Sequence, residues 1–198
     1  MLNGIGATNT RDPELTVRRI LKVNHAGEFG AIRIYGAQIF VARWLFPDIV
    51  SKLEEMRDDE IDHCRLFREA MPARSARPCR VMSLWSLGGF VLGFLTALCG
   101  RNTIWICTEA VESTVHQHLE DQLKFLRSRD PALHKLILSI QEQELAHLTE
   151  AENNQNSEGI MRAVLLPIIC GLTDLMIWLS TWGDSSRMRV EMARDKAI

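Results

Sequence analysis

Two Glu-x-x-His steps are the feature of this sequence best suited to chemistry. Glu60 is followed by His63, and Glu144 is followed by His147. Residues three apart in a helix lie on one face, so each step would direct a carboxylate and an imidazole the same way. Such groups ligate divalent metal ions. One step alone is weak support for a metal site, because Glu and His often fall at this spacing by chance.

Two further glutamates lie at matching distances from these steps. Glu28 precedes Glu60 by 32 residues, and Glu112 precedes Glu144 by 32 residues. The two sets are offset by 84 residues, since 112 − 28, 144 − 60 and 147 − 63 all equal 84. An apolar segment in each half follows the same offset. The spacing therefore predicts a twofold internal repeat of three helices, although the halves share little sequence identity.

Helix is the expected structure almost throughout, because apolar residues recur at helical spacing and alternating β-branched runs are absent. We expect four helices over about 15–44, 47–70, 102–127 and 131–152, with Asn102 or Thr103 capping the third. Uncharged or nearly uncharged helices are expected over 81–99 and 160–182, and a polar break over 153–159. The chain is predicted to be one domain, 1–198, with its core at about 13–182 and a charged, fraying tail at 183–198.

Short loops would join the four chemistry-bearing helices in antiparallel pairs. Pro47 and the Asp130-Pro131 step mark these loops. Residues equally far from such a turn lie at the same depth, so the two glutamates of each pair can meet. Four carboxylates and two imidazoles facing one axis form the ligand set of a dinuclear iron or manganese carboxylate bundle. The predicted ligands are Glu28, Glu60, His63, Glu112, Glu144 and His147.

Other polar residues are expected around these ligands. Asp59 and Gln143, again 84 apart, each precede a ligand glutamate, and each is expected to reach the histidine of the other step. Tyr35, the single tyrosine, follows Glu28 by seven residues on the same face. We expect it to relay electrons or to bond a carboxylate, with a packed core position as the alternative. His116 is a weaker candidate ligand.

Composition excludes several classes of protein. The 198 residues carry a net charge of −2, which argues against a nucleic-acid partner. A hydrophobic content of 46% and a mean hydropathy of −0.04 argue against a polytopic membrane protein. Five cysteines without a Cys-x-x-Cys pair fit a reducing compartment rather than a zinc site or disulfide framework. Residues 1–14 show no apolar run typical of a secretory signal.

Four segments of the sequence resemble one known family. The string Asn24-His25-Ala26-Gly27-Glu28-Phe29-Gly30 resembles the first helix of the demethoxyubiquinone hydroxylase family. Residues 55–63, 110–113 and 142–147 resemble its other three motifs, in the same order, and the resemblance spans about 13–179. It implies an all-α, ferritin-like four-helix bundle with two additional apolar helices. It also implies an O2-dependent monooxygenase with two iron ions that hydroxylates the ring of demethoxyubiquinone or demethoxyubiquinol in ubiquinone biosynthesis.

The same resemblance implies a peripheral membrane protein, since the substrate carries a polyprenyl tail. We expect the apolar helices to dock into one leaflet at the cytoplasmic face of a bacterial inner membrane, with the matrix side of the mitochondrial inner membrane less favoured. A helix over 81–99 would be about 28 Å long, so a transmembrane helix is the competing interpretation. Electrons would come from the quinol itself, NADH or a reductase. Homo-oligomers could form through the apolar helices.

Two other classes of function use similar residues. A ferritin- or rubrerythrin-like protein would oxidise or store iron with the same ligands. The long apolar helices and the absence of rubredoxin-type cysteine pairs disfavour it. A metal-free structural bundle would not need six ligand residues at a repeated offset.

Overall fold

The structure, a computed structural model, describes residues 13–155 and 159–195. These residues form helices and connecting turns without a strand, which confirms the all-α class. Residues 1–12, and with them most of the N-terminal segment considered for a signal, lie outside the described residues, as do 156–158 of the expected polar break. The α-helices are α1 (Pro13–Leu45), α2 (Val50–Ala70), α3 (Met82–Leu98), α4 (Arg101–Leu126), α5 (Pro131–Asn154), α6 (Ile160–Ser180) and α7 (Asp184–Asp195), with 3-10 turns η1 (Pro47–Ile49) and η2 (Pro72–Arg74).

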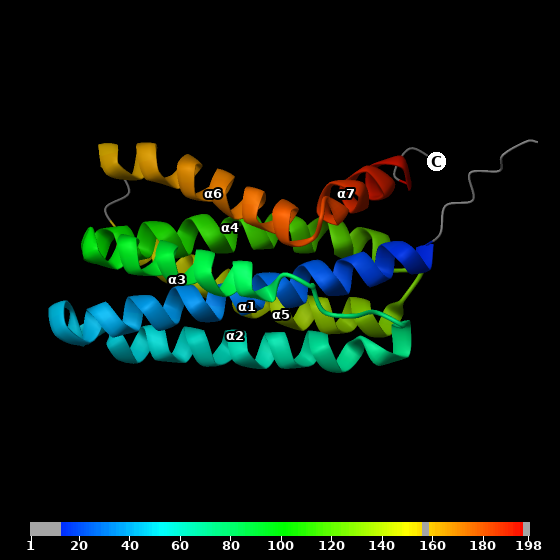
Figure 1. Ribbon diagram of the computed structural model, residues 1–198, viewed down its shortest axis with the longest axis horizontal. Coiled ribbons are helices and arrows are strands. Elements are labelled where there is room, and N and C mark those ends of the chain that lie inside the picture. Colours follow the sequence, from blue (N-terminus) through cyan, green and yellow to red (C-terminus); the bar gives the residue numbers. More distant parts are fainter. Residues whose placement is uncertain (1–12, 156–158, 196–198) are drawn as a thin grey trace, which may run out of the picture.

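Four long helices, α1, α2, α4 and α5, lie side by side along the long axis of the molecule (Figure 1). The chain reverses at η1, and again at Asp130, whose side chain accepts a hydrogen bond from the backbone N–H of Leu133 at 3.0 Å. Pro131 follows at the first helical position, where its missing N–H costs nothing. The expected cap of α4 was wrong. Gly100, with φ of 117°, precedes the helix, because only glycine adopts that conformation readily.

The connection from α2 to α4 is helix α3, which packs closely on α1. Small residues make this approach possible. A Cβ atom added at Gly89 would lie 2.5 Å from the carbonyl oxygen of Gly30, and one added at Gly93 would overlap the backbone of Ile34. The two glycines therefore let the backbones of α3 and α1 come into direct contact.

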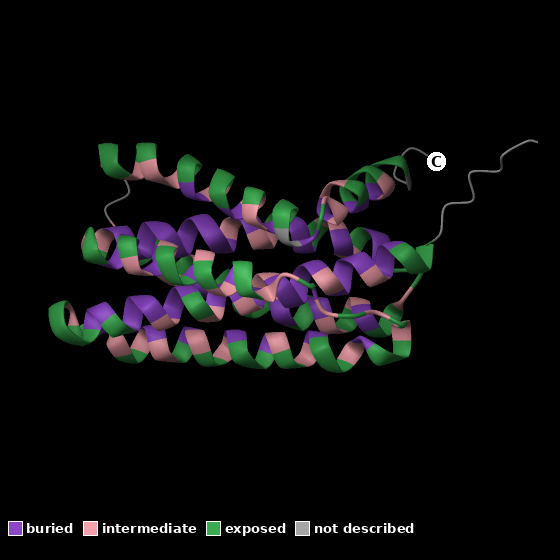
Figure 2. Cartoon of the chain, viewed as in Figure 1, coloured by how far each residue is buried: buried purple, intermediate pink, exposed green. Residues whose placement is uncertain are grey.

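Helix α6 packs on α4 by one narrow face. Ile169, Thr173 and Ile177, at spacings of four residues, are buried there. Most of its other apolar side chains are exposed, as the outer ribbon of Figure 2 shows. Among the described helices, α6 alone has the length and apolar composition to cross a membrane, a property that core helices of soluble proteins share. Pro167 lies inside α6 without ending it.

The sequence predicted that the charged C-terminal segment would fray. In the structure, residues Asp184–Asp195 of this segment instead form helix α7. Met188 and Met192, four residues apart, are buried where α7 packs on α1 and α4. Glu191 accepts a hydrogen bond from Arg19 Nη1 at 2.8 Å, and Asp184 pairs with Lys22. An apolar stripe of two methionines within a charged sequence is thus sufficient to dock this helix. Residues 196–198 of the predicted tail lie outside the described part.

Candidate metal centre

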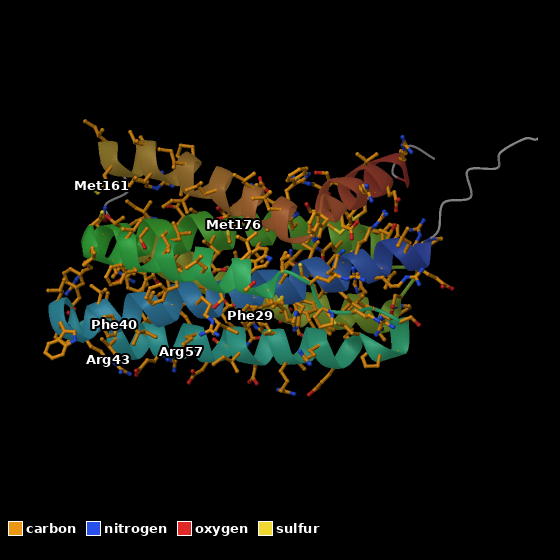
Figure 3. All side chains as sticks on the ribbon, in the orientation of Figure 1. Phe29, Phe40, Arg43, Arg57, Met161 and Met176 are labelled. Atoms are coloured by element: carbon orange, nitrogen blue, oxygen red, sulfur yellow. The ribbon has the colours of Figure 1, made fainter. Side chains whose placement is uncertain are left out.

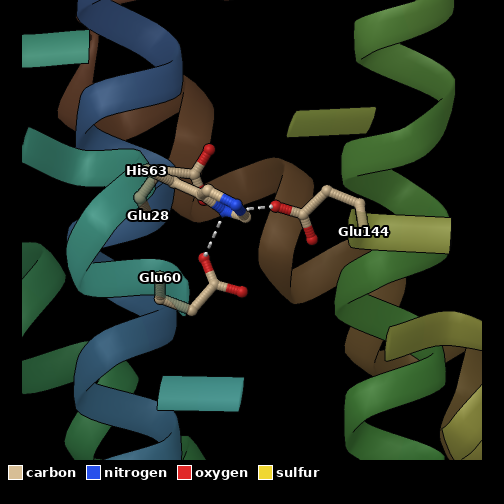
Figure 4. A group of neighbouring side chains, drawn as sticks. All are labelled: Glu28, Glu60, His63 and Glu144. Carbon is tan, nitrogen blue, oxygen red and sulfur yellow. Dashed lines mark ion pairs between the residues drawn. The ribbon is translucent and has the colours of Figure 1, made fainter. Parts of the chain in front are cut away.

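The bundle interior holds a cluster of charged side chains contributed by all four long helices. Each of these side chains is at most 5% exposed. Figure 4 shows four of them, with the imidazole of one histidine directed at two carboxylates. The predicted spacing is the reason for this convergence, because it places the residues of each antiparallel pair at equal depth. The cluster consists of Glu28 on α1, Glu60 and His63 on α2, Glu112 on α4, and Glu144 and His147 on α5.

Two overlapping groups of ligand atoms can be distinguished in this cluster. Within each group, every ligand atom lies within 4.8 Å of the others. Glu60 and Glu144 belong to both groups, so they would be shared by the two ions. One glutamate and one histidine from the pair α1 and α2, or from the pair α4 and α5, would complete each position. Four carboxylates balance the four positive charges of two divalent cations. The groups are Glu28, Glu60, His63 and Glu144, and Glu60, Glu112, Glu144 and His147.

The outer nitrogen of each histidine ring has a partner on the opposite helix. His147 Nε2 lies 3.1 Å from Asp59 Oδ2, and His63 Nε2 lies 3.0 Å from Gln143 Oε1. These are the two crossed contacts expected from the sequence. A carboxylate can only accept a hydrogen bond, so Nε2 of His147 carries the proton. In a neutral ring this arrangement leaves Nδ1 free to ligate a metal, as outer partners of metal-binding histidines generally do.

Several inner atoms of the cluster have no hydrogen-bond partner. They are both carboxylate oxygens of Glu60 and Glu144, and Nδ1 of His63 and of His147. His63 Nδ1 lies 3.0 Å from a Glu144 oxygen, but the ring is not aligned for a hydrogen bond. An unpaired buried polar group costs about 1–3 kcal/mol, so such groups are rare. A set of unpartnered acidic oxygens and imidazole nitrogens around one space fits a pair of divalent metal ions.

Crowding of carboxyl groups changes their protonation. Burial, followed by the charges of Glu60 and Glu144, raises the pKa of Glu28 well above its usual range. Burial and the charges of Glu144 and Glu60 raise the pKa of Glu112 in the same way. Burial also acts to raise the pKa of Glu144, but the two neighbouring histidines outweigh it and the pKa is lowered. Two carboxyl groups therefore keep protons that bound cations would displace.

The charges of the cluster also change the pKa values of its two histidines. Burial by itself lowers the pKa of His63, but the nearby Glu144 and Glu60 carboxylates overcome this effect and raise it to about 12. For His147 burial is likewise outweighed by Glu144 and Glu60, and the pKa is raised to about 11. Without a metal, the two imidazolium rings thus supply positive charge to the cluster.

Tyr35 bonds a carboxylate, one of the two roles expected for it. Its buried hydroxyl donates a hydrogen bond to Glu112 Oε1 at 2.6 Å. Burial and the Glu112 charge raise the pKa of Tyr35 well above its usual range, so the phenol keeps its proton. The bond fixes the orientation of one carboxylate of the cluster, whereas an electron-relay role stays a prediction.

Sequence reasoning missed a buried amide pair next to the cluster. Asn24 Nδ2 donates to Gln122 Oε1 at 2.7 Å, and Gln122 Nε2 donates to Asn24 Oδ1 at 2.9 Å. This reciprocal pair joins α1 to α4 one turn from Glu28. The available signal was an asparagine on the same helix face as Glu28, which is unusual for an apolar core position.

The remaining histidines on α1 and α4 lie outside the two groups. His116 faces Glu120 at 3.6 Å, so it does not compete as a ligand. His118 Nε2 lies 3.2 Å from Asp174 of α6, which accounts for the acidic residue in that apolar helix. His25 is buried.

An apolar cavity of about 260 Å3 lies between α1, α3, α4 and α6. Gly27 and Ala31, on either side of Glu28 in the chain, line it from α1, and Val111, next to Glu112, lines it from α4. Trp85 of α3 and Met176 of α6 complete its wall; Figure 3 labels Met176 on the ribbon of α6. An elongated apolar ligand could therefore lie against the backbone that carries two cluster glutamates.

Comparison with known proteins agrees with the cluster and the fold. Residues 15–180 match the family model described as ubiquinone biosynthesis protein COQ7. A mouse relative named NADPH-dependent 3-demethoxyubiquinone 3-hydroxylase, mitochondrial, is 38% identical over 169 residues, which cover 83% of this chain and 76% of that protein. A Rhodospirillum rubrum relative named 3-demethoxyubiquinol 3-hydroxylase is 33% identical over 172 residues, covering 85% of this chain and 79% of that protein. The yeast relative named 5-demethoxyubiquinone hydroxylase, mitochondrial, is 30% identical over 175 residues, covering 81% and 75%. Since the family model and relatives of this similarity both span most of its length, the chain belongs to the COQ7 family of ubiquinone biosynthesis proteins.

Proposed function

We propose that this chain hydroxylates the ring of demethoxyubiquinone or demethoxyubiquinol, using O2, a reductant and two iron ions. The observation that carries the proposal is the buried cluster of four glutamates and two histidines, in which Glu60 and Glu144 are shared between two positions. The family to which the chain belongs, and the hydroxylase names of its relatives, support the reaction. Iron would supply the activation of O2, the step for which amino-acid side chains have no suitable chemistry.

The protein residues would hold and orient this centre. The proposed ligands are Glu28, Glu60, His63, Glu112, Glu144 and His147, and Tyr35 is proposed as a further catalytic residue. Asp59 and Gln143 fix the histidine rings from behind, and the Tyr35 hydroxyl fixes Glu112. Burial of all six ligands keeps bulk water from the reacting groups, which strengthens every electrostatic interaction inside the site.

The apolar cavity is the proposed path of the polyprenyl quinone. Helices α3 and α6 contribute to its lining, and their outer faces carry exposed leucine, valine and aromatic side chains. We propose that these faces rest on one membrane leaflet, so that the quinone reaches the centre without crossing water. The proposed location is the cytoplasmic face of a bacterial inner membrane, with the matrix face of the mitochondrial inner membrane as the alternative that the mitochondrial relatives support. The alternative to membrane contact is that two copies of the chain associate through these outer faces of α3 and α6.

The source of electrons is proposed to be reduced nicotinamide nucleotide, acting directly or through the quinol, or a separate reductase. The mouse relative's name, which contains NADPH dependence, supports the first source. An iron-oxidising or iron-storing protein would use the same cluster, but it would have no use for an apolar cavity that reaches the helix backbone beside Glu28 and Glu112.

The test is the quinone mass profile of source cells that lack this gene. We expect accumulation of a quinone without one methoxy group, restored by the intact gene but not by Glu144→Ala. Glu142→Gln, a change of an exposed neighbour on α5, should restore it and serves as the control. An unchanged profile, in cells without a second enzyme for the step, would contradict the proposed reaction.

A further inference from the structure

A second pocket, unlike the first, is polar and lies between α2 and α5. It has a volume of about 150 Å3. Lys52, Glu55 and Asp59 line it from α2, and His147 and Glu150 line it from α5. The function proposed above makes no use of this pocket, since the apolar cavity is formed by other helices.

The pocket leads to the metal centre through one histidine. His147 belongs both to the lining of the pocket and to the second group of ligand atoms. Its ring is 5% exposed, and Nδ1 has no hydrogen-bond partner. Asp59, at the mouth, holds the outer nitrogen of this ring at 3.1 Å. The pocket thus reaches the outer side of a ligand residue whose buried Nδ1 belongs to the cluster.

Charge and size of the pocket suit a small cation. Three carboxylates line it against two cationic groups, the His147 ring and Lys52, whose Nζ is already paired with Glu55 Oε2 at 2.8 Å. Negative charge concentrated in a concave site raises the local cation concentration. At roughly 30 Å3 per water molecule, the volume holds about five waters, so an ion would enter with part of its hydration shell. An ion that entered the apolar cavity would lose its hydration shell without polar groups to replace it.

The equivalent position in the other half of the chain lacks counterparts of the three pocket carboxylates. Shifting the residue numbers of the pocket by 84 gives the equivalent residues around His63. Leu66 is equivalent to Glu150, and Leu136 is equivalent to Lys52. Both leucines are partly buried, and His63 is only 1% exposed. The two histidines therefore differ in access from solvent, although both have the same kind of outer partner.

We propose that the pocket between α2 and α5 is the entry route for divalent metal ions into the buried centre. Glu55 and Glu150 attract the ion from solvent, and the ion passes the ring of His147 to reach the shared carboxylates. The inference rests on the proposed function only in requiring that the cluster bind metal. Glu55 and Glu150 affect the rate at which metal ions enter the centre, but not the number of ions bound at equilibrium.

The test measures Co2+ uptake by the metal-free full-length protein in a stopped-flow instrument, from the visible absorption of bound Co2+. We expect the double variant E55Q/E150Q to load about tenfold more slowly than wild type at low ionic strength, and the difference to shrink as salt is added. Final Co2+ content should be unchanged. The matched control is D58N/E142Q, which removes two exposed carboxylates from the same two helices outside the pocket.

A second variant changes shape instead of charge. Ala146→Leu places an apolar side chain in the pocket wall, and we expect it also to slow uptake without lowering the final content. The proposal is overturned if E55Q/E150Q loads at the wild-type rate or slows no more than D58N/E142Q. If wild-type protein binds no Co2+ at equilibrium, the metal centre and the proposed function fail as well, so the two failures are distinguishable.

Discussion

Replacing Tyr35 with phenylalanine tests how the centre is held. The change removes one hydroxyl and leaves the buried ring in place, so the lost interaction is the 2.6 Å hydrogen bond to Glu112 Oε1. A hydrogen bond to a charged group contributes about 1.5–3 kcal/mol. Since 1.4 kcal/mol corresponds to a factor of ten, metal affinity should fall by about 10- to 100-fold, the range found for outer partners of metal ligands.

The expected loss is confined to one of the two metal positions. Glu112 belongs to the group with His147 and is absent from the group with Glu28 and His63. Titration of the metal-free Tyr35→Phe protein with Co2+ should therefore show one weakened binding step and one wild-type step. The second position is an internal control for folding. Equal weakening of both steps, or none, would refute the view that this hydroxyl orients one carboxylate.

Three further predictions concern stability. In the metal-free protein, the folded-state pKa values of His63 and His147, about 12 and 11, lie above the unfolded value, so their stabilisation is complete below about pH 6.5 and is lost as pH rises toward those values. Urea unfolding between about pH 6 and 9 should show this decline, and a flat profile would contradict it. Gly93→Ala places a methyl group against the backbone of α1 and should cost about 1–3 kcal/mol, whereas Gly171→Ala, which has open space around it, should not destabilise the fold. Met188→Ala should cost about 2–5 kcal/mol in thermal or urea unfolding, and a wild-type value would mean that α7 does not contribute to the core.

The positions of the six buried cluster residues were largely predictable because helical geometry turns sequence spacing into position. The offset of 84 residues predicted the six cluster residues, and the residues before Glu60 and Glu144 predicted the crossed contacts to the histidines. Both inferences need only the period of a helix and an antiparallel turn. The twofold repeat itself, and the extent of the domain, stay predictions.

Contacts between distant segments could not be predicted in the same way. Helix α7 docks through Met188 and Met192, but its local sequence is mostly charged, and nothing in it identifies α1 as the partner. The amide pair of Asn24 and Gln122 joins residues 98 positions apart. The contact between His118 and Asp174 joins residues of α4 and α6 that are far apart in the sequence. Long-range pairing of polar groups leaves no periodic trace in a single sequence.

The different outer partners of the two histidines make the halves of the centre electronically unequal. Asp59 carries a full negative charge behind His147, whereas Gln143 presents a neutral amide to His63. A carboxylate draws the ring proton more strongly and makes that imidazole the better electron donor. An ion held by His147 would therefore meet a more electron-rich ligand than an ion held by His63. The chain in this way gives two chemically similar positions different surroundings.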